Sequence, residues 1–149
     1  MSVDVSTAIV IDRPVADVAA FASNPDNVPQ WYANIESIEW ITPPPMTVGS
    51  RLAFVANFLS RHLAYTYQVV EWTPGVRLVM RTSAGPFPME TSYVWEAVAD
   101  NRTRMVLRNR GVPSGFAAWA APLMTIAIRR ANRKDLARLK ARLERRGDG

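Results

Sequence analysis

The feature that most constrains the fold is a regular alternation of polar and apolar residues in two neighbouring stretches, METSYVWEA (89–97) and TRMVLRNR (103–110). Successive side chains of a β-strand point to opposite faces of a sheet, so a period of two predicts two strands. Each strand then has one charged, solvated face and one aromatic, apolar face. An antiparallel sheet of this kind needs a second layer, so the sequence predicts that another element covers the apolar face.

The loop between these two strands determines how they pair. A two-residue turn would mix the charged and apolar faces, because an odd shift in register turns a strand over. A three-residue loop over residues 100–102 instead pairs Trp95 with Leu107 and Tyr93 with Asn109. The same register places acidic residues of one strand on the face that carries the arginines of the other, namely Glu90, Glu96, Arg104, Arg108 and Arg110.

The remainder of the chain predicts further strands and two short helices. Residues 3–11 alternate as a strand, Pro14 suits the first position of a short helix, and a second brief helix carries Trp31. Further extended stretches are expected at residues 35–41, 50–59, 63–73, 76–82, 88–99 and 102–110.

The last part of the chain, from Pro122 onward, predicts one long helix. Apolar residues recur on one side at helical spacing, with Leu136 at the margin, and they are Met124, Ile128, Ala131, Leu139 and Leu143. The first half is apolar nearly all round, with residues 115–121 as a short lead-in, so we expect the sheet and the loops to enclose it. No other segment is long and apolar enough to cover the sheet.

Composition favours one globular domain over residues 1–149, because 48% of the residues are hydrophobic and 21% are charged. The absence of cysteine excludes disulfides and thiolate chemistry, and suits the cytoplasmic location that we expect. The N-terminal residues lack the pattern of a signal peptide. The longest apolar run, residues 116–128, spans 13 residues, whereas a membrane-spanning helix needs roughly 20.

Positive charge is concentrated at the C-terminus. Residues 1–128 hold nine arginines against ten acidic residues, whereas residues 129–149 hold nine basic and three acidic residues. Such a tail can attract nucleic acid or anionic lipid, but a solvated helix face is the commoner reason for a run of charge. We therefore expect no nucleic-acid partner, and contact with a membrane stays open.

Several short motifs follow one another along nearly the whole chain. They are IVIDRPVADVAAF (9–21), Trp31 before the second strand, VGSRL (48–52), YQVVEWTPGVRLVMR (67–81), YVWEAVADNRTRMVL (93–107) and LARLKARLE (136–144). Their order and spacing resemble the START/Bet v 1-like (SRPBCC) superfamily, in particular its polyketide cyclase/dehydrase and lipid-transport group. The resemblance implies an α+β helix-grip fold, in which a curved antiparallel sheet of six to seven strands wraps around a long C-terminal helix, with two short helices after the first strand.

The resemblance also implies a cavity between the sheet and the long helix that holds an apolar or amphipathic small molecule. It places Trp31 at one end of this cavity, near where a ligand would enter, and leaves Trp40 to ordinary packing. The candidate ligand-binding residues are Trp31, Phe54, Phe58, Tyr67, Met80, Tyr93, Trp95, Met105, Leu107, Asn109, Met124 and Ile128. A filled core made of the same residues is the alternative, and only the resemblance favours a cavity.

Few residues suit catalysis. His62 is the only histidine, and we expect it on the surface near the tip of a hairpin. A conventional zinc site needs three or four ligands, so we expect no metal, and we assign no cofactor. The chain lacks a G-x-S-x-G motif and a glycine-rich phosphate loop. We assign no catalytic residue, but the apolar face offers acid–base candidates at Tyr65, Tyr67, Glu71, Tyr93 and Asn109.

Three functions stay open at the level of sequence. We favour the binding or carriage of a hydrophobic small molecule of lipid, polyketide or aromatic type. A polyketide cyclase or dehydratase would use the same cavity to enolise and dehydrate a poly-β-keto chain, which requires positioned proton donors and a base. The third is a quinone- or membrane-associated interaction protein. The expected partner is a hydrophobic ligand, and the oligomeric state is left open.

Overall fold

The computed structural model describes residues 3–58, 60–84, 88–111 and 121–147. Their elements follow the predicted order, with a strand, short helices, six further strands and a long helix. The elements are β1 (Val3–Ile11), α1 (Val15–Ser23), η1 (Pro25–Asn27), α2 (Val28–Trp31), β2 (Ile35–Trp40), β3 (Arg51–Phe58), β4 (Arg61–Thr73), β5 (Arg77–Ala84), β6 (Met89–Ala99), β7 (Arg102–Gly111) and α4 (Ala121–Gly147).

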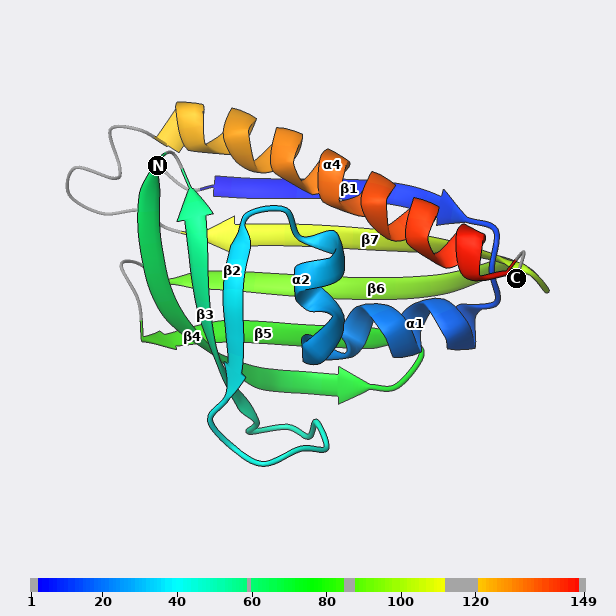
Figure 1. The fold of residues 1–149 in the computed structure, drawn as a ribbon, viewed down its shortest axis with the longest axis horizontal. Helices are drawn as coiled ribbons and strands as arrows, with labels where there is room; N and C mark the ends of the chain where they lie inside the picture. Colours follow the sequence, from blue (N-terminus) through cyan, green and yellow to red (C-terminus); the bar gives the residue numbers. More distant parts are fainter. Residues whose placement is uncertain (1–2, 59, 85–87, 112–120, 148–149) are drawn as a thin grey trace.

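The seven strands form one antiparallel sheet in the order β1-β7-β6-β5-β4-β3-β2. The sheet curves strongly, so that β2 and β3 run across the direction of β5, β6 and β7 (Figure 1). The long helix α4 contacts β1, while α1 contacts β6 and α2 contacts α4. This curled sheet around a long C-terminal helix is the predicted helix-grip fold.

Turn and cap residues account for the short connections between these elements. The helix α1 begins at Val15, one position later than predicted, so that Pro14 is its N-cap and not its first residue; the fixed φ of Pro14 suits the beginning of a helix. The side chain of Asn24 accepts a hydrogen bond from the Asp26 amide at 3.0 Å and caps η1. Gly75 has a φ of 78° in the turn between β4 and β5, a conformation that strains residues with a Cβ.

The predicted register between β6 and β7 is wrong by two residues. Trp95 lies opposite Met105, and Tyr93 lies opposite Leu107. The chain turns tightly between Ala99 and its partner Arg102, and a β-bulge between Ala97 and Ala99 takes up one extra residue. A two-residue turn alone would shift the register by an odd number of residues and turn one strand over, but the extra residue in the bulge makes the shift even. Every side chain therefore stays on its predicted face of the sheet.

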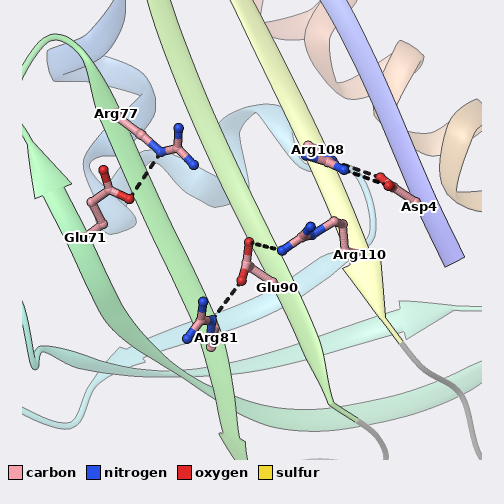
Figure 2. A network of polar contacts seen from close by, with 7 residues as sticks. All are labelled: Asp4, Glu71, Arg77, Arg81, Glu90, Arg108 and Arg110. Atoms are coloured by element: carbon pink, nitrogen blue, oxygen red, sulfur yellow. Dashed lines mark hydrogen bonds and ion pairs between the residues drawn. The ribbon is translucent and has the colours of Figure 1, made fainter. Parts of the chain in front are cut away.

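The outer face of the sheet carries the predicted ladder of opposite charges, which Figure 2 shows. The carboxylate of Glu90 lies 2.7 Å from Arg81 on β5 and 3.1 Å from Arg110 on β7. Asp4 on β1 pairs with Arg108 on β7 at 2.7 Å. Acidic residues thus lie across from arginines of the last strand, as the alternation predicts.

The helix α4 uses its two halves differently. In the second half, Leu136, Leu139 and Leu143 are buried in the main core, as predicted. The prediction that the first half is enclosed all round is wrong, because Leu123 is 60% exposed and Ile126 is 58% exposed. A helix presents only one stripe to a sheet, and here that stripe is Ala121, Met124 and Ile128, which pack with Val3 and Val5 of β1. Of the predicted lead-in over residues 115–121, residues 115–120 lie outside the described residues, and Ala121 is the first residue of α4.

No helix in the described part of the chain is long and apolar enough to cross a membrane.

Candidate functional site

A cavity of about 150 Å³ lies between the concave face of the sheet and α4. Its walls come from β2–β7 and from the middle of α4, with Tyr32 closing one side. Seven of the predicted ligand-binding residues line it, namely Phe54, Tyr67, Met80, Tyr93, Asn109, Met124 and Ile128. The same elements thus bring together residues that lie far apart in the sequence.

Four other predicted site residues lie in the core and not in the cavity wall, namely Trp31, Trp95, Met105 and Leu107. Trp31 is fully buried, and its ring packs against Tyr32 at 4.2 Å and against Tyr93 at 5.8 Å between ring centroids. Tyr32 therefore takes the place in the cavity wall that was expected for Trp31. The side chain of Phe58 lies outside the described residues, and Trp40 packs against the core, as expected.

A chain of hydrogen bonds crosses one wall of the cavity. The Tyr67 hydroxyl lies 2.7 Å from the Thr91 hydroxyl, and the Asn109 amide donates to Thr91 at 2.8 Å. The side-chain amide of Asn132 on α4 donates in turn to the side-chain Oδ1 atom of Asn109 at 2.6 Å. Because β4, β6, β7 and α4 each contribute one member, the chain holds these polar groups at defined positions. Thr91 and Asn132 were not among the predicted residues.

Two tyrosines meet in the wall of the cavity. The hydroxyl groups of Tyr32 and Tyr93 lie 2.6 Å apart. Burial raises the pKa of both phenols well above the ordinary value, and burial also raises the pKa of Tyr67 to about 12. All three phenols are therefore neutral near pH 7, where they can donate or accept hydrogen bonds but cannot act as phenolate bases.

Among the described residues, one acidic side chain lines the cavity, and it is not one of the residues predicted from the sequence. Asp135 on α4 is 6% exposed, and its Oδ1 atom accepts a hydrogen bond from the Ala33 amide at 3.1 Å. Burial is the largest cause that raises its pKa, to about 6. Asp135 lies three residues after Asn132 and four residues before Leu139, so helical spacing places it on the buried face of α4. This spacing is the sequence signal that indicates its burial. The group can therefore exchange a proton near neutral pH.

Two polar candidates from the sequence lie outside the cavity. Glu71 turns outward and pairs with Arg77 at 3.2 Å (Figure 2), because a register shift between Val69 and Glu71 reverses the alternation. The prediction that Glu71 lies on the apolar face is therefore wrong. His62 lies on the surface, as expected, and its Nδ1 atom is 3.1 Å from the carboxylate of Glu36. Tyr65 does line the cavity, stacked against Phe54.

Comparison with solved structures places this fold among known ones. A protein from Thermus thermophilus, TTHA0849, is 19% identical, with a TM-score of 0.81 over 94% of this chain and 96% of its own. The Zhui aromatase/cyclase from Streptomyces sp. R1128 is 15% identical, with a TM-score of 0.84 over 98% and 96%. A START superfamily protein from Mycobacterium smegmatis is 12% identical, with a TM-score of 0.79 over 95% and 97%. At these identities the likeness concerns the fold alone.

Comparison of sequences identifies the family. No curated protein matches the chain. The sequence profile described as polyketide cyclase / dehydrase and lipid transport matches residues 2–144, which is nearly the whole chain. The chain therefore belongs to the polyketide cyclase/dehydrase and lipid transport family, the group that its motifs resemble.

Proposed function

We propose that the protein binds a hydrophobic small molecule in the cavity between the sheet and α4. The observation that carries this proposal is the cavity itself, whose walls combine aromatic and aliphatic side chains with a few polar groups at defined positions. That composition is typical of small-molecule sites. The family description, which includes lipid transport, supports the same function.

The volume of the cavity limits how much of a ligand it can bury. A dry cavity of about 150 Å³ in another protein accommodates benzene. Pockets for drug-sized ligands measure about 300–1,000 Å³. In the described conformation, the cavity of about 150 Å³ therefore holds one aromatic ring or a short alkyl segment. The rest of a larger ligand extends beyond it.

Filling the cavity tests this proposal. Ala131 on α4 lines the cavity, whereas Ala137 on the same helix is exposed. We expect Ala131→Phe to abolish the fluorescence gain of a neutral apolar probe such as N-phenyl-1-naphthylamine, and Ala137→Phe to leave it unchanged. Circular dichroism checks that both variants fold. Equal probe binding by both folded variants would show that the ligand site lies elsewhere.

A second candidate function, cyclisation or dehydration of a poly-β-keto chain, is favoured by the acid–base groups in the cavity. Asp135 and the Tyr32–Tyr93 pair line the same space. The Asp135 carboxylate can accept the proton α to a carbonyl, and a tyrosine hydroxyl can donate a hydrogen bond to the carbonyl oxygen. Asp135 then returns the proton to the departing hydroxyl, which leaves as water. Two of the matched structures are aromatase/cyclases, which agrees with this candidate.

Asp135→Asn separates the two functions. If the cavity only binds, the variant keeps its affinity for the neutral probe and the wild type shows no turnover of a linear poly-β-ketone. If the cavity catalyses, the wild type releases a dehydrated ring and Asp135→Asn loses this activity by a factor of about 10²–10⁴ while it retains probe binding. Product formation is followed by mass spectrometry.

A further inference from the structure

An open groove adjoins the cavity along the first half of α4. The groove measures about 550 Å³ and lies between the first half of α4 and the region where β2 begins and β3 ends. Four residues, Asn34, Asn57, Ala131 and Asp135, line both the groove and the cavity. The two spaces are therefore neighbours along these four residues, and the groove is the adjacent space for the part of a ligand that the cavity does not hold.

The groove is apolar at one end and basic at the other. Leu123 and Ile126, which are 60% and 58% exposed, lie in its wall. Arg130 and Lys134 follow on the same helix, also in the groove wall. Among the residues that the structure describes, neither basic side chain pairs with a carboxylate. Next to exposed apolar surface, the groove thus presents two basic side chains that form no ion pair with any described residue, and one carboxyl group, that of Asp135, also lines it.

The spacing of the two basic residues has an energetic consequence. Arg130 and Lys134 stand four residues apart on a helix, and like charges at this spacing face each other and weaken the helix. A bound anion between them removes this repulsion and can accept charge-assisted hydrogen bonds from both side chains. Two such donors at the rim of an apolar cavity suit a ligand with one charged end.

We infer that the ligand is an amphipathic anion, whose apolar end enters the cavity and whose carboxylate or phosphate lies in the groove between Arg130 and Lys134. This inference rests on the proposed binding function and adds the chemical class of the ligand. The cavity of about 150 Å³ is too small for a whole lipid or polyketide, so the polar end of such a molecule lies in the groove. An anion is the group that the unpaired charges of that groove recognise.

Three ten-carbon ligands test the inference. Decanoate, decyl phosphate and 1-decanol carry the same chain with a carboxylate, a phosphate or a neutral head, and each is titrated below its micellar range against the bound neutral probe. We expect one or both anions to bind about tenfold more tightly than decanol, since a charged hydrogen bond contributes about that factor. The head group that binds more tightly identifies the anion. Added salt weakens the binding of the anions and leaves decanol unaffected.

Paired charge-removing variants locate the anion. Arg130→Gln/Lys134→Gln removes both charges of the groove, whereas Arg129→Gln/Arg133→Gln removes two exposed charges of the same helix that do not line it. We expect the first variant to lose about tenfold in affinity for the preferred anion and less than twofold for decanol. The second variant should change neither by more than twofold, which controls for the general positive field of α4.

The outcomes separate failure of this inference from failure of the proposed function. If decanol and the neutral probe bind but the anions bind no better, or both variants behave alike, the anion site is wrong and the binding function stands. If neither the probe nor any of the three ligands binds to the folded wild type, the proposed binding function is wrong, and the inferred anion site is then wrong as well. Tighter binding of an anion that only Arg130→Gln/Lys134→Gln weakens supports both.

Discussion

At the scale of single residues, Asp135 best shows how burial changes the chemistry of a side chain. Its carboxyl group is 6% exposed and receives one backbone hydrogen bond, from Ala33. Burial disfavours the charged form more than this hydrogen bond stabilises it, so the pKa rises to about 6. The neighbouring phenols of Tyr32 and Tyr93 stay neutral for the same reason. The wall of the cavity therefore has one group that titrates near neutral pH.

The raised pKa of Asp135 predicts how stability depends on pH. The pKa of this carboxyl group is higher in the folded state than in the unfolded chain. The group therefore does not lower the stability of the fold at low pH, and it lowers that stability increasingly as the pH rises through about 6. Asp135→Asn keeps the oxygen that accepts from Ala33 but removes the charge. We expect the free energy of unfolding of this variant, relative to that of the wild type, to be higher by roughly 1–3 kcal/mol at pH 8 than at pH 4, which means a more stable variant at pH 8.

Urea unfolding at the two pH values measures this difference. Asp100→Asn, at an exposed turn position, controls for the general effect of removing one negative charge. If the difference between Asp135→Asn and wild type is the same at pH 4 and pH 8, the carboxyl group does not have a raised pKa, and its role as a proton acceptor loses its basis.

At the scale of elements, α4 combines the functions of core, cavity wall and surface. Leu136, Leu139 and Leu143 close the main core, whereas Asn132 and Asp135 face the cavity. Leu123 and Ile126, on the first half of the helix, remain largely exposed. The helix therefore stabilises the fold mainly through its second half and serves the candidate site mainly through its first half.

Leucine truncations on α4 test this division. Leu139 is fully buried, so we expect Leu139→Ala to lower the free energy of unfolding by roughly 2–4 kcal/mol. Leu123 is 60% exposed on the same helix, so Leu123→Ala should change it by less than about 0.5 kcal/mol. Chemical unfolding followed by circular dichroism gives both values. A large loss with Leu123→Ala would mean that the first half of α4 is covered after all.

At the scale of the whole molecule, charge is divided between the sheet and the helix. The outer face of the sheet is neutralised by ion pairs such as Glu90 with Arg81 and Arg110 (Figure 2). Exposed pairs of this kind contribute only about 0.2–1 kcal/mol each. The excess positive charge belongs to residues 129–149, and two of their basic residues, Arg130 and Lys134, line the candidate groove.

Truncation of the tail distinguishes a docking surface from a solvated helix end. We expect removal of residues 145–149 to change stability little, because chain ends make few contacts. We also expect the truncated protein to sediment with anionic vesicles, and to bind RNA, no differently from the full chain. A salt-sensitive loss of vesicle or RNA binding on truncation would instead make the tail a docking surface.

Much of the fold could be predicted because its signals are local. The alternation in residues 89–97 and 103–110 follows from strand geometry, and the leucine stripe of α4 follows from the helical repeat. These periods require no knowledge of distant partners. The sequence by itself therefore determined the order of elements, the polarity of each sheet face and, through its motifs, the family.

Only the tertiary structure decided which side chains reach the cavity. The bulges at Val98 and Val70 set the register of β7 and turn Glu71 outward, and a bulge depends on how neighbouring strands pair. Whether an apolar residue fills the core, as Trp31 does, or lines a cavity, as Phe54 does, depends on the volume that all packed elements leave between them. Asp135 gains its chemistry in the same way, because burial by distant parts of the chain raises its pKa.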